Sequence, residues 1–415
     1  MLSQEENDLL TRTGPDTPMG RLMRRYWIPA VFSHQVAKPD CPPVRVKLLG
    51  ENLVAFRDTE GRPGLVDERC PHRTASMFFG RNEECGLRCV YHGWKFDVTG
   101  KCVDLPSEPP GSNFQDKVSI KAYPCHEAGG IVWAYMGPAE LKPEFPPLEW
   151  TLLPPENIYA SRHIQECNWL QGLEGGFDSA HLGFLHRGSN AVNANSITPS
   201  RHDAFRTGFG MMVGVGRQIA EDRIRWGSNL MILPFHKVFA TTPNGAHMWV
   251  PMDDENTMLY SIDFKPSGPF TDEELELSRK FLHIHTENIP GTDRAVQNRD
   301  NDYMIDREAQ ASGGSFTGMH GLAIQDSAVQ ESMGPVADRT MEHLGSSDIA
   351  IIRIRKMLLD VVAAHEAGGT PPGLDPNDYR ARSTRFILPP DGDFTAAVED
   401  QLAEQTGAGQ YFSGT

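Results

Sequence analysis

The sequence of 415 residues lacks a run of eighteen apolar residues, the length that a membrane-spanning helix requires. Its first ten residues are acidic and have no apolar core of the kind that export signals carry. Positive charge is also in short supply, because 39 Lys and Arg stand against 55 Asp and Glu, giving a net charge of −16. Such a chain is poorly suited to nucleic acid. We therefore expect a cytoplasmic protein that binds neither a membrane nor nucleic acid.

Cysteine is sparse as well. There are seven, an odd number without regular spacing, which does not suggest a disulfide scaffold and fits a reducing compartment. Cys70 and Cys89 differ from the others because each stands two or three residues before a histidine. The remaining cysteines are interpreted as ordinary small side chains: Cys41, Cys85, Cys102, Cys125 and Cys167.

These two cysteines open two short pairs of a thiol and an imidazole. Cys70 and His72 are spaced Cys-x-His, Cys89 and His92 are spaced Cys-x-x-His, and sixteen residues separate the pairs. Iron and zinc are the metals that accept such mixed sulfur and nitrogen ligands. A [2Fe–2S] centre with thiolates on one iron and histidines on the other needs two of each, split over two loops. The alternative is a structural Cys2His2 zinc site, although zinc fingers usually pair cysteine with cysteine and histidine with histidine.

Length favours two domains, since 415 residues exceed one ordinary hydrophobic core. The first third of the chain shows short strand patterns with frequent turns, which predicts a small β-sandwich that presents both ligand loops from one end. Residues 138–155 contain six prolines and are interpreted as the connection. We therefore predict one domain at 1–150, including an N-terminal helix at 3–12, and a second at 151–415.

A second set of metal-binding residue types lies in a predicted amphipathic helix: Glu174, Asp178, His181 and His186. Steps of four and three residues stack the first three on one helix face. The second histidine lies five residues beyond the first, about 140° further round, so we predict an irregular turn near Gly183 that brings both imidazoles onto one metal. Glycines cost a helix about 1 kcal/mol each, so their number here indicates a functional constraint. They are Gly172, Gly175, Gly176 and Gly183.

Two histidines and one carboxylate on one side of Fe(II) form the ligand set of non-haem enzymes that activate O₂. The carboxylate has to come from another part of the chain. The candidates are Asp300, Asp302, Asp306, Glu308, Asp326, Glu331 and Asp338. Physical argument does not choose among them.

The two motifs together resemble the catalytic subunit of a Rieske non-haem iron aromatic-ring-hydroxylating oxygenase, over nearly the whole chain. The resemblance rests on Cys70, His72, Cys89 and His92, followed by Asp178, His181 and His186. Residues 324–345 are similar to the phthalate-dioxygenase-like branch, in which the third iron ligand corresponds to Asp326. The resemblance thus implies that His181, His186 and Asp326 bind the mononuclear iron.

The resemblance implies an α+β chain, with an N-terminal Rieske β-sandwich domain and a C-terminal helix-grip catalytic domain of antiparallel sheet and helices. It implies two cofactors, a [2Fe–2S] Rieske cluster and a mononuclear Fe(II). It further implies a homotrimer, or a hexamer built from two trimers. Electrons then pass from the cluster of one subunit to the iron of its neighbour, with Asp178 as the bridging catalytic carboxylate.

The implied function is that of the oxygenase component of a multicomponent system. It uses O₂ and electrons from an NAD(P)H-dependent reductase, with flavin and ferredoxin groups as candidate carriers, to dihydroxylate an aromatic carboxylate or related substituted arene. One alternative is a Rieske monooxygenase that carries out oxidative O- or N-dealkylation. The alternative of another class is an electron-transfer or zinc-stabilised binding protein.

A carboxylate substrate favours an arginine in the pocket. The candidates are Arg201, Arg206, Arg217 and Arg225, with Phe235 and His247 as further candidate pocket residues. The loop at 242–247 contains no basic residue, which argues against phthalate itself as the substrate.

Overall fold

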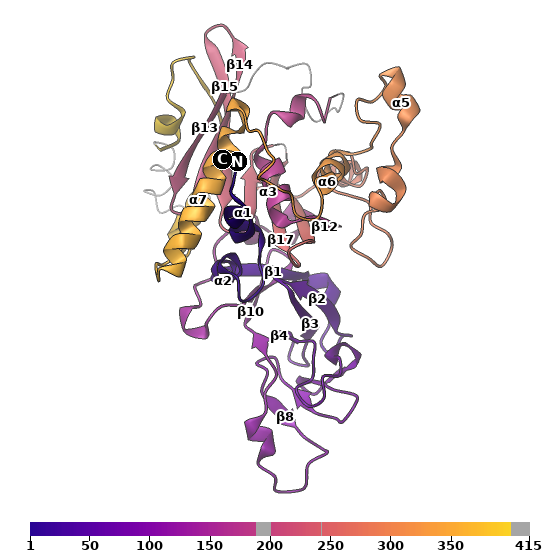
Figure 1. The fold of residues 1–415 in the computed structure, drawn as a ribbon. Coiled ribbons are helices and arrows are strands. Elements are labelled where there is room, and N and C mark those ends of the chain that lie inside the picture. Colours follow the sequence, from indigo (N-terminus) through magenta and orange to yellow (C-terminus); the bar gives the residue numbers. More distant parts are fainter. Residues whose placement is uncertain (188–200, 242, 400–415) are drawn as a thin grey trace. The chain divides into compact units, whose positions relative to one another are not determined.

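The computed structural model describes residues 1–187, 201–241 and 243–399, and these fall into two units (Figure 1). One unit is Met23–Phe145, and the other joins Met1–Leu22 to Pro146–Thr415. Among the described residues, no helix is both long and apolar enough to span a bilayer.

The unit Met23–Phe145 consists of short antiparallel strands in three sheets. The first sheet has the order β1 (Trp27–Phe32), β11 (Ile131–Tyr135) and β10 (Cys125–Ala128). The second has the order β2 (Val44–Leu48), β3 (Glu51–Arg57), β4 (Pro63–Asp67) and β9 (Ala122–Tyr123). The third has the order β5 (Arg81–Glu83), β6 (Gly86–Arg88), β7 (Lys95–Phe96) and β8 (Cys102–Asp104). Cys70 and Cys89 belong to one buried cluster together with Phe56, Trp94 and Phe96, so the hydrophobic core holds both ligand loops from beneath.

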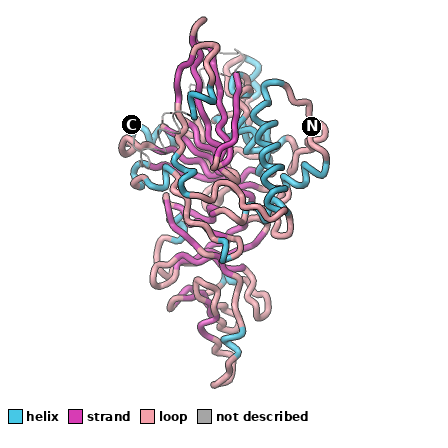
Figure 2. The backbone as a smooth tube through the Cα atoms, turned by 90° about the vertical axis from the view of Figure 1, so that its left-hand side faces the viewer, coloured by secondary structure: helices cyan, strands magenta, loops and turns pink. Residues whose placement is uncertain are grey.

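The larger unit is built on one eight-stranded antiparallel sheet. Its order is β12 (Ile158–Gln165), β18 (Thr257–Phe264), β17 (Asn244–Pro251), β16 (His236–Phe239), β15 (Arg223–Ile232), β14 (Gly210–Ala220) and β13 (Arg201–Thr207), with β19 (Arg385–Leu388) paired to β15. Figure 2 shows the long strands of this sheet beside the helices. The predicted α+β class, with a β-rich first part and an antiparallel sheet with helices in the second, is confirmed.

The described residues also form helices. They are α1 (Gln4–Thr11), α2 (Pro18–Met23), α3 (Trp169–Phe177), α4 (Asp272–Ser278), α5 (Arg307–Ser312), α6 (Leu322–Ser332) and α7 (Ile349–Glu366). α7 buries Ile351, Ile354, Leu358, Val361 and Val362 at helical spacing, and it packs against β13 and β14. α3 packs against β16, β17 and α6, which places its end beside the middle of the sheet.

Glycines let α3 approach the sheet closely. A Cβ atom on Gly172 would lie 2.2 Å from the Trp249 indole, and one on Gly176 would lie 2.3 Å from the same ring. A Cβ on Gly175 would instead meet the Gln330 side chain of α6. The glycine content of this helix, which we attributed to function, therefore has a packing cause at Gly172 and Gly176, where the neighbouring atoms belong to a rigid ring.

The N-terminal helix packs with the larger unit. The Asn7 amide donates a hydrogen bond to the Ala337 carbonyl at 3.1 Å, and the Trp169 indole N–H donates to the Leu10 carbonyl at 3.2 Å. The predicted boundary at residue 150 would group this helix with the first domain instead. These bonds join segments far apart in the chain, so local sequence patterns carry no sign of them.

Candidate metal centres

Two similar loops carry the predicted cluster ligands in the β-rich unit. The Thr74 N–H donates to the Cys70 carbonyl at 2.8 Å, and the Gly93 N–H donates to the Cys89 carbonyl at 2.9 Å. Thr74 and Gly93 both have left-handed backbone conformations, with φ of 59° and 80°. At Gly93 a Cβ would also lie 2.6 Å from the Pro106 ring, so glycine suits both the turn and the space.

The predicted cluster ligands form two close pairs, one of thiols and one of imidazoles. Cys70 and Cys89 are almost fully buried, and the rings of His72 and His92 have centroids 4.3 Å apart. Trp94 stacks on His72 at a centroid distance of 4.3 Å, which fixes the plane of that imidazole. The spacing and types of these residues predicted the set, and the structure brings its two histidines together.

Two features of these side chains fit a metal cluster. His72 Nδ1 is buried and has no hydrogen-bond partner among the described residues, a costly state for a protein nitrogen. Burial, reinforced by the neighbouring Cys89, raises the pKa of the Cys70 thiol to about 11. Bound iron would supply the missing partner and the positive charge that a buried thiolate needs. Two sulfur and two imidazole donors match the ligand set of a Rieske [2Fe–2S] cluster.

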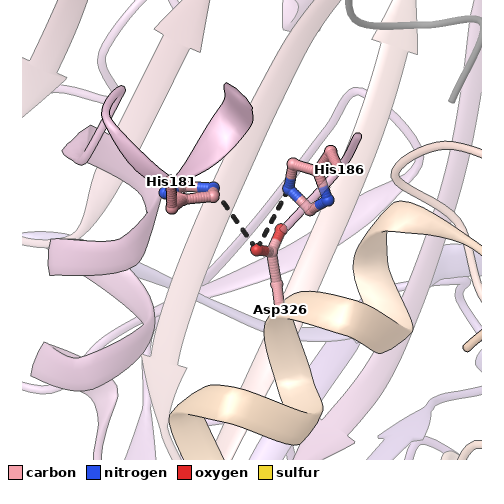
Figure 3. Close-up of side chains that lie close together, drawn as sticks. All are labelled: His181, His186 and Asp326. Atoms are coloured by element: carbon pink, nitrogen blue, oxygen red, sulfur yellow. Dashed lines mark ion pairs between the residues drawn. The ribbon is translucent and has the colours of Figure 1, made fainter. Parts of the chain in front are cut away.

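The second candidate centre lies in the larger unit, where His181, His186 and Asp326 converge (Figure 3). Asp326 Oδ1 lies 3.5 Å from His181 Nε2 and 3.3 Å from His186 Nε2, and the ligand atoms all fall within 4.8 Å of one another. Asp326 comes from α6, whereas both histidines follow α3. Two imidazoles and one carboxylate on one side match the donor set of a mononuclear non-haem Fe(II).

The chain leaves the helical path before it reaches this site. α3 ends at Phe177, and Asp178 has an extended conformation with ψ of 113°. Its carboxylate accepts a hydrogen bond from the Ala180 N–H at 2.7 Å, a local turn that competes with continuation of the helix. The irregular turn predicted near Gly183 is confirmed as a 3-10 turn at 181–183. On a continuous helix, a spacing of five residues would point the two histidines in different directions. The turn allows both side chains to face the same point.

The prediction that Glu174 shares a face with Asp178 and His181 is wrong, because the helix ends between them. Glu174 is buried, and it accepts hydrogen bonds from Arg339 at 2.9 Å and from Arg355 at 2.6 Å. Burial alone would raise the pKa of this carboxyl, but the two guanidinium groups outweigh it and hold the pKa below its usual value. Glu174 therefore anchors α3 to the loop before α7 and to α7 itself.

Each histidine of the second centre uses its Nδ1 atom for a supporting contact. His186 Nδ1 lies 2.7 Å from the Gln325 amide oxygen, so it donates and carries the proton. His181 Nδ1 lies 3.4 Å from Asp178 Oδ2. Both Nε2 atoms are thereby left to face Asp326 and a metal. Gln325 was absent from the predicted site, although it is the sequence neighbour of the candidate ligand Asp326.

The charges of this centre suit a dication. Burial raises the pKa of Asp326, but the contact with His186 and the charge of His181 more than offset it, so the pKa is lowered. The pKa of Asp178 is lowered in the same way, because His181 outweighs burial. Both carboxylates are therefore anionic near neutral pH, which is the form that binds metal.

The other predicted carboxylates have different neighbours. Asp300 pairs with Arg294 at 2.6 Å, Glu331 accepts from the Tyr303 hydroxyl at 2.6 Å, and Asp306 caps α5. Among the described residues, none of the candidates apart from Asp326 joins the two histidines: Asp300, Asp302, Asp306, Glu308, Glu331 and Asp338.

Two of the predicted carboxylate-binding arginines have other partners. Arg206 forms an ion pair with Asp360 of α7, and Arg201 donates to the Pro390 carbonyl. His247, a predicted pocket residue, lies on β17 opposite β16 and is stacked on Phe239 with a centroid distance of 5.3 Å.

Comparison with known proteins agrees with both centres. The Rieske [2Fe–2S] domain family matches residues 26–124, and the LigXa C-terminal domain like family matches 134–210 and 214–389. The chain is 41% identical to the phthalate 4,5-dioxygenase oxygenase subunit of Pseudomonas putida, over 93% of this chain and 92% of that protein. It is 38% identical to the 3-chlorobenzoate-3,4-dioxygenase oxygenase subunit of Comamonas testosteroni, over 97% and 99%.

Among solved structures, a caffeine-bound NdmA variant of Pseudomonas putida CBB5 has the same fold. Its TM-score is 0.62 at 19% identity, over 91% of this chain and 99% of that one.

The chain therefore belongs to the Rieske non-haem iron aromatic-ring-hydroxylating oxygenases, enzymes that carry a [2Fe–2S] Rieske cluster and a mononuclear iron. Within that family it is a catalytic oxygenase subunit of the phthalate-dioxygenase-like branch. This membership sets aside a zinc-stabilised binding protein and a simple electron carrier, because a catalytic domain follows the Rieske domain.

Proposed function

We propose that this oxygenase dihydroxylates an aromatic carboxylate or a related substituted arene. In this reaction one arene, one O₂, two electrons and two protons give one cis-dihydrodiol. The observation that carries the proposal is the convergence of His181, His186 and Asp326 in a chain that is similar, along nearly its whole length, to oxygenase subunits named for phthalate and chlorobenzoate. Both of those named compounds are aromatic carboxylates.

We assign the ligands of the two cofactors residue by residue. Cys70 and Cys89 would hold one iron of the cluster, and His72 and His92 would hold the other. His181, His186 and Asp326 would hold the mononuclear iron. When bound, the cluster supplies single electrons and the mononuclear iron binds and activates O₂.

The remaining residues of the site orient these ligands. Gln325 fixes the tautomer and ring plane of His186, and Asp178 does the same for His181. We also assign Asp178 the role of bridge to His92 of a neighbouring subunit, within a homotrimer or a hexamer of two trimers. Its support is that the carboxylate is anionic, part-exposed and already in contact with a ligand of the mononuclear iron.

The partner would be an NAD(P)H-dependent reductase, with or without a separate ferredoxin. We place the system in the cytoplasm, in keeping with seven free cysteines in the structure.

Product analysis with ¹⁸O₂ tests the proposal. The iron-loaded protein and a surrogate reductase are supplied with benzoate, 3-chlorobenzoate, phthalate and a methoxybenzoate. A dihydrodiol carrying two ¹⁸O atoms is the expected product. A phenol with release of formaldehyde from the methoxybenzoate would instead assign oxidative dealkylation. If none of the four compounds is oxygenated while both metal centres are filled, the proposed substrate class is wrong.

A further inference from the structure

A lysine of the central sheet faces α3. Along β16 the side chains alternate, so that His236 and Val238 are buried on one face while Lys237 and Phe239 lie on the other. Lys237 stands directly opposite His247 of β17. Its ammonium donates a hydrogen bond to the Gly176 carbonyl in the last turn of α3, so this face of the sheet looks toward the helix that leads into the iron ligands.

The surroundings of this ammonium are aromatic. Nζ lies 5.4 Å from the ring centre of Phe177 and 4.9 Å from that of Phe239. Among the described residues, no Asp or Glu forms an ion pair with it, although a charge buried without a partner is costly. Burial lowers the pKa of Lys237 to about 8, and the charge of Asp326 opposes that shift. Gly176, whose carbonyl accepts from this ammonium, lies five residues before the candidate iron ligand His181.

A structural role explains only part of this arrangement. An ammonium at the C-terminus of a helix is favourable, because it binds a free carbonyl and the negative end of the helix dipole. An ammonium has three N–H donors, however, and the Gly176 carbonyl takes one of them. The ammonium lies near the rings of Phe177 and Phe239, on the face of the sheet that α3 covers.

We propose that Lys237 binds the carboxylate of the substrate and so selects for anionic arenes. This inference rests on the proposed function and deepens it by naming the residue that recognises the acid group. It also explains how the loop at 242–247 can lack a basic residue, since the positive charge comes from the preceding strand. Lysine acts here as a point charge that a single carboxylate can approach.

Anaerobic calorimetry on the iron-loaded protein tests this role apart from turnover. The variant Lys237→Met keeps an unbranched side chain that is one atom shorter and removes its charge. The probes are 3-chlorobenzoate and its uncharged analogue 3-chlorobenzamide. We expect affinity for the benzoate to fall by about 10- to 100-fold, the range for one charge-assisted hydrogen bond, while affinity for the benzamide changes by less than about twofold.

Two further variants serve as controls. Lys237→Arg keeps the positive charge and should restore part of the affinity for 3-chlorobenzoate. Lys356→Met removes an exposed lysine of α7 and should leave both affinities unchanged, which controls for net charge. An unaltered cluster spectrum and iron content establish that each variant is folded.

The outcomes separate the two proposals. If the parent protein binds 3-chlorobenzoate and Lys237→Met binds it equally well, the lysine role is wrong and the substrate class stands. Equal losses for benzoate and benzamide mean that Lys237 only supports α3, which also overturns the inference. If the parent protein binds neither 3-chlorobenzoate nor phthalate yet oxygenates uncharged arenes, the substrate class fails and the lysine role fails with it.

Discussion

Replacing Gly176 by alanine should disturb the iron site through packing alone. The added methyl group would lie 2.3 Å from Cη2 and 2.8 Å from Cζ2 of the Trp249 ring. Ordinary carbon contacts begin at about 3.5 Å, so the overlap is roughly 1.2 Å. Trp249 is buried, and it also lies against Gly172 one turn earlier, so the ring cannot swing away. The end of α3 must therefore move by about 1 Å.

Two opposing terms set the size of the effect on stability. Overpacking a core costs about 1–3 kcal/mol, whereas alanine in place of glycine favours a helix by about 1 kcal/mol. We expect a net loss of about 1 kcal/mol in the free energy of unfolding, or about 2–4 °C in the apparent unfolding midpoint. The effect on metal is larger, because ligand distances tolerate only about 0.2 Å and His181 follows the helix end closely.

Gly175→Ala is the matched control for this experiment. The neighbouring position has the same helix propensity, but its Cβ would meet the far end of the flexible Gln330 side chain, which can move. Iron analysis and thermal unfolding compare the two variants. Gly176→Ala should bind mononuclear iron about 10- to 100-fold more weakly with an unchanged cluster spectrum, and Gly175→Ala should resemble the parent. Equal iron content and equal midpoints in both variants would refute the packing argument.

Three further predictions concern Asp178, Gln325 and Glu174. Asp178→Asn should keep both cofactors but lose most coupled turnover, measured as product per NAD(P)H consumed, and unchanged coupling would remove the bridging role. Gln325→Met should weaken mononuclear iron binding by about 10- to 100-fold, because the His186 tautomer is no longer fixed. Chelator competition measures this affinity, and an unaltered value would show that Gln325 does not support the site. Glu174→Gln should cost about 3–5 kcal/mol at pH 7, since it leaves the buried Arg339 without an anion and leaves Arg355 paired with Glu342 alone. Because the pKa of Glu174 is lowered on folding, its contribution is present above about pH 4.3 and is lost as the pH falls further. The gap in denaturant midpoints between parent and variant should therefore narrow in acid, and a gap independent of pH would contradict the ion-pair account.

Local spacing in the sequence was enough to predict the candidate cluster ligands, and also the two histidines that the structure brings together with Asp326. A Cys-x-His and a Cys-x-x-His pair fix their geometry within short loops, and the turn near Gly183 follows from helix arithmetic. Physical argument left the third candidate ligand undecided. The position of Asp326 depends on where α6 packs, and α6 lies far along the chain from His186. The resemblance to a family indicated Asp326, and the structure places its carboxylate beside both histidines.

The errors have one physical source, which is contact between distant segments. Glu174 was assigned to the metal face because nothing in its own segment reveals Arg339 and Arg355. The glycines of α3 signalled function, whereas the cause at Gly172 and Gly176 is an indole from a strand more than seventy residues later. Strand alternation could place a side chain on one face of a sheet, but it could not say which helix covers that face.

Iron and acid-labile sulfide measured together test the central claim most directly, in the parent protein, in Asp326→Ala and in Asp338→Ala. Asp338 was a candidate ligand by sequence, but it is exposed and bonds to Thr340. The account predicts about three irons and about two sulfides per chain in the parent and in Asp338→Ala, against about two of each in Asp326→Ala. Retention of the third iron in Asp326→Ala would contradict it.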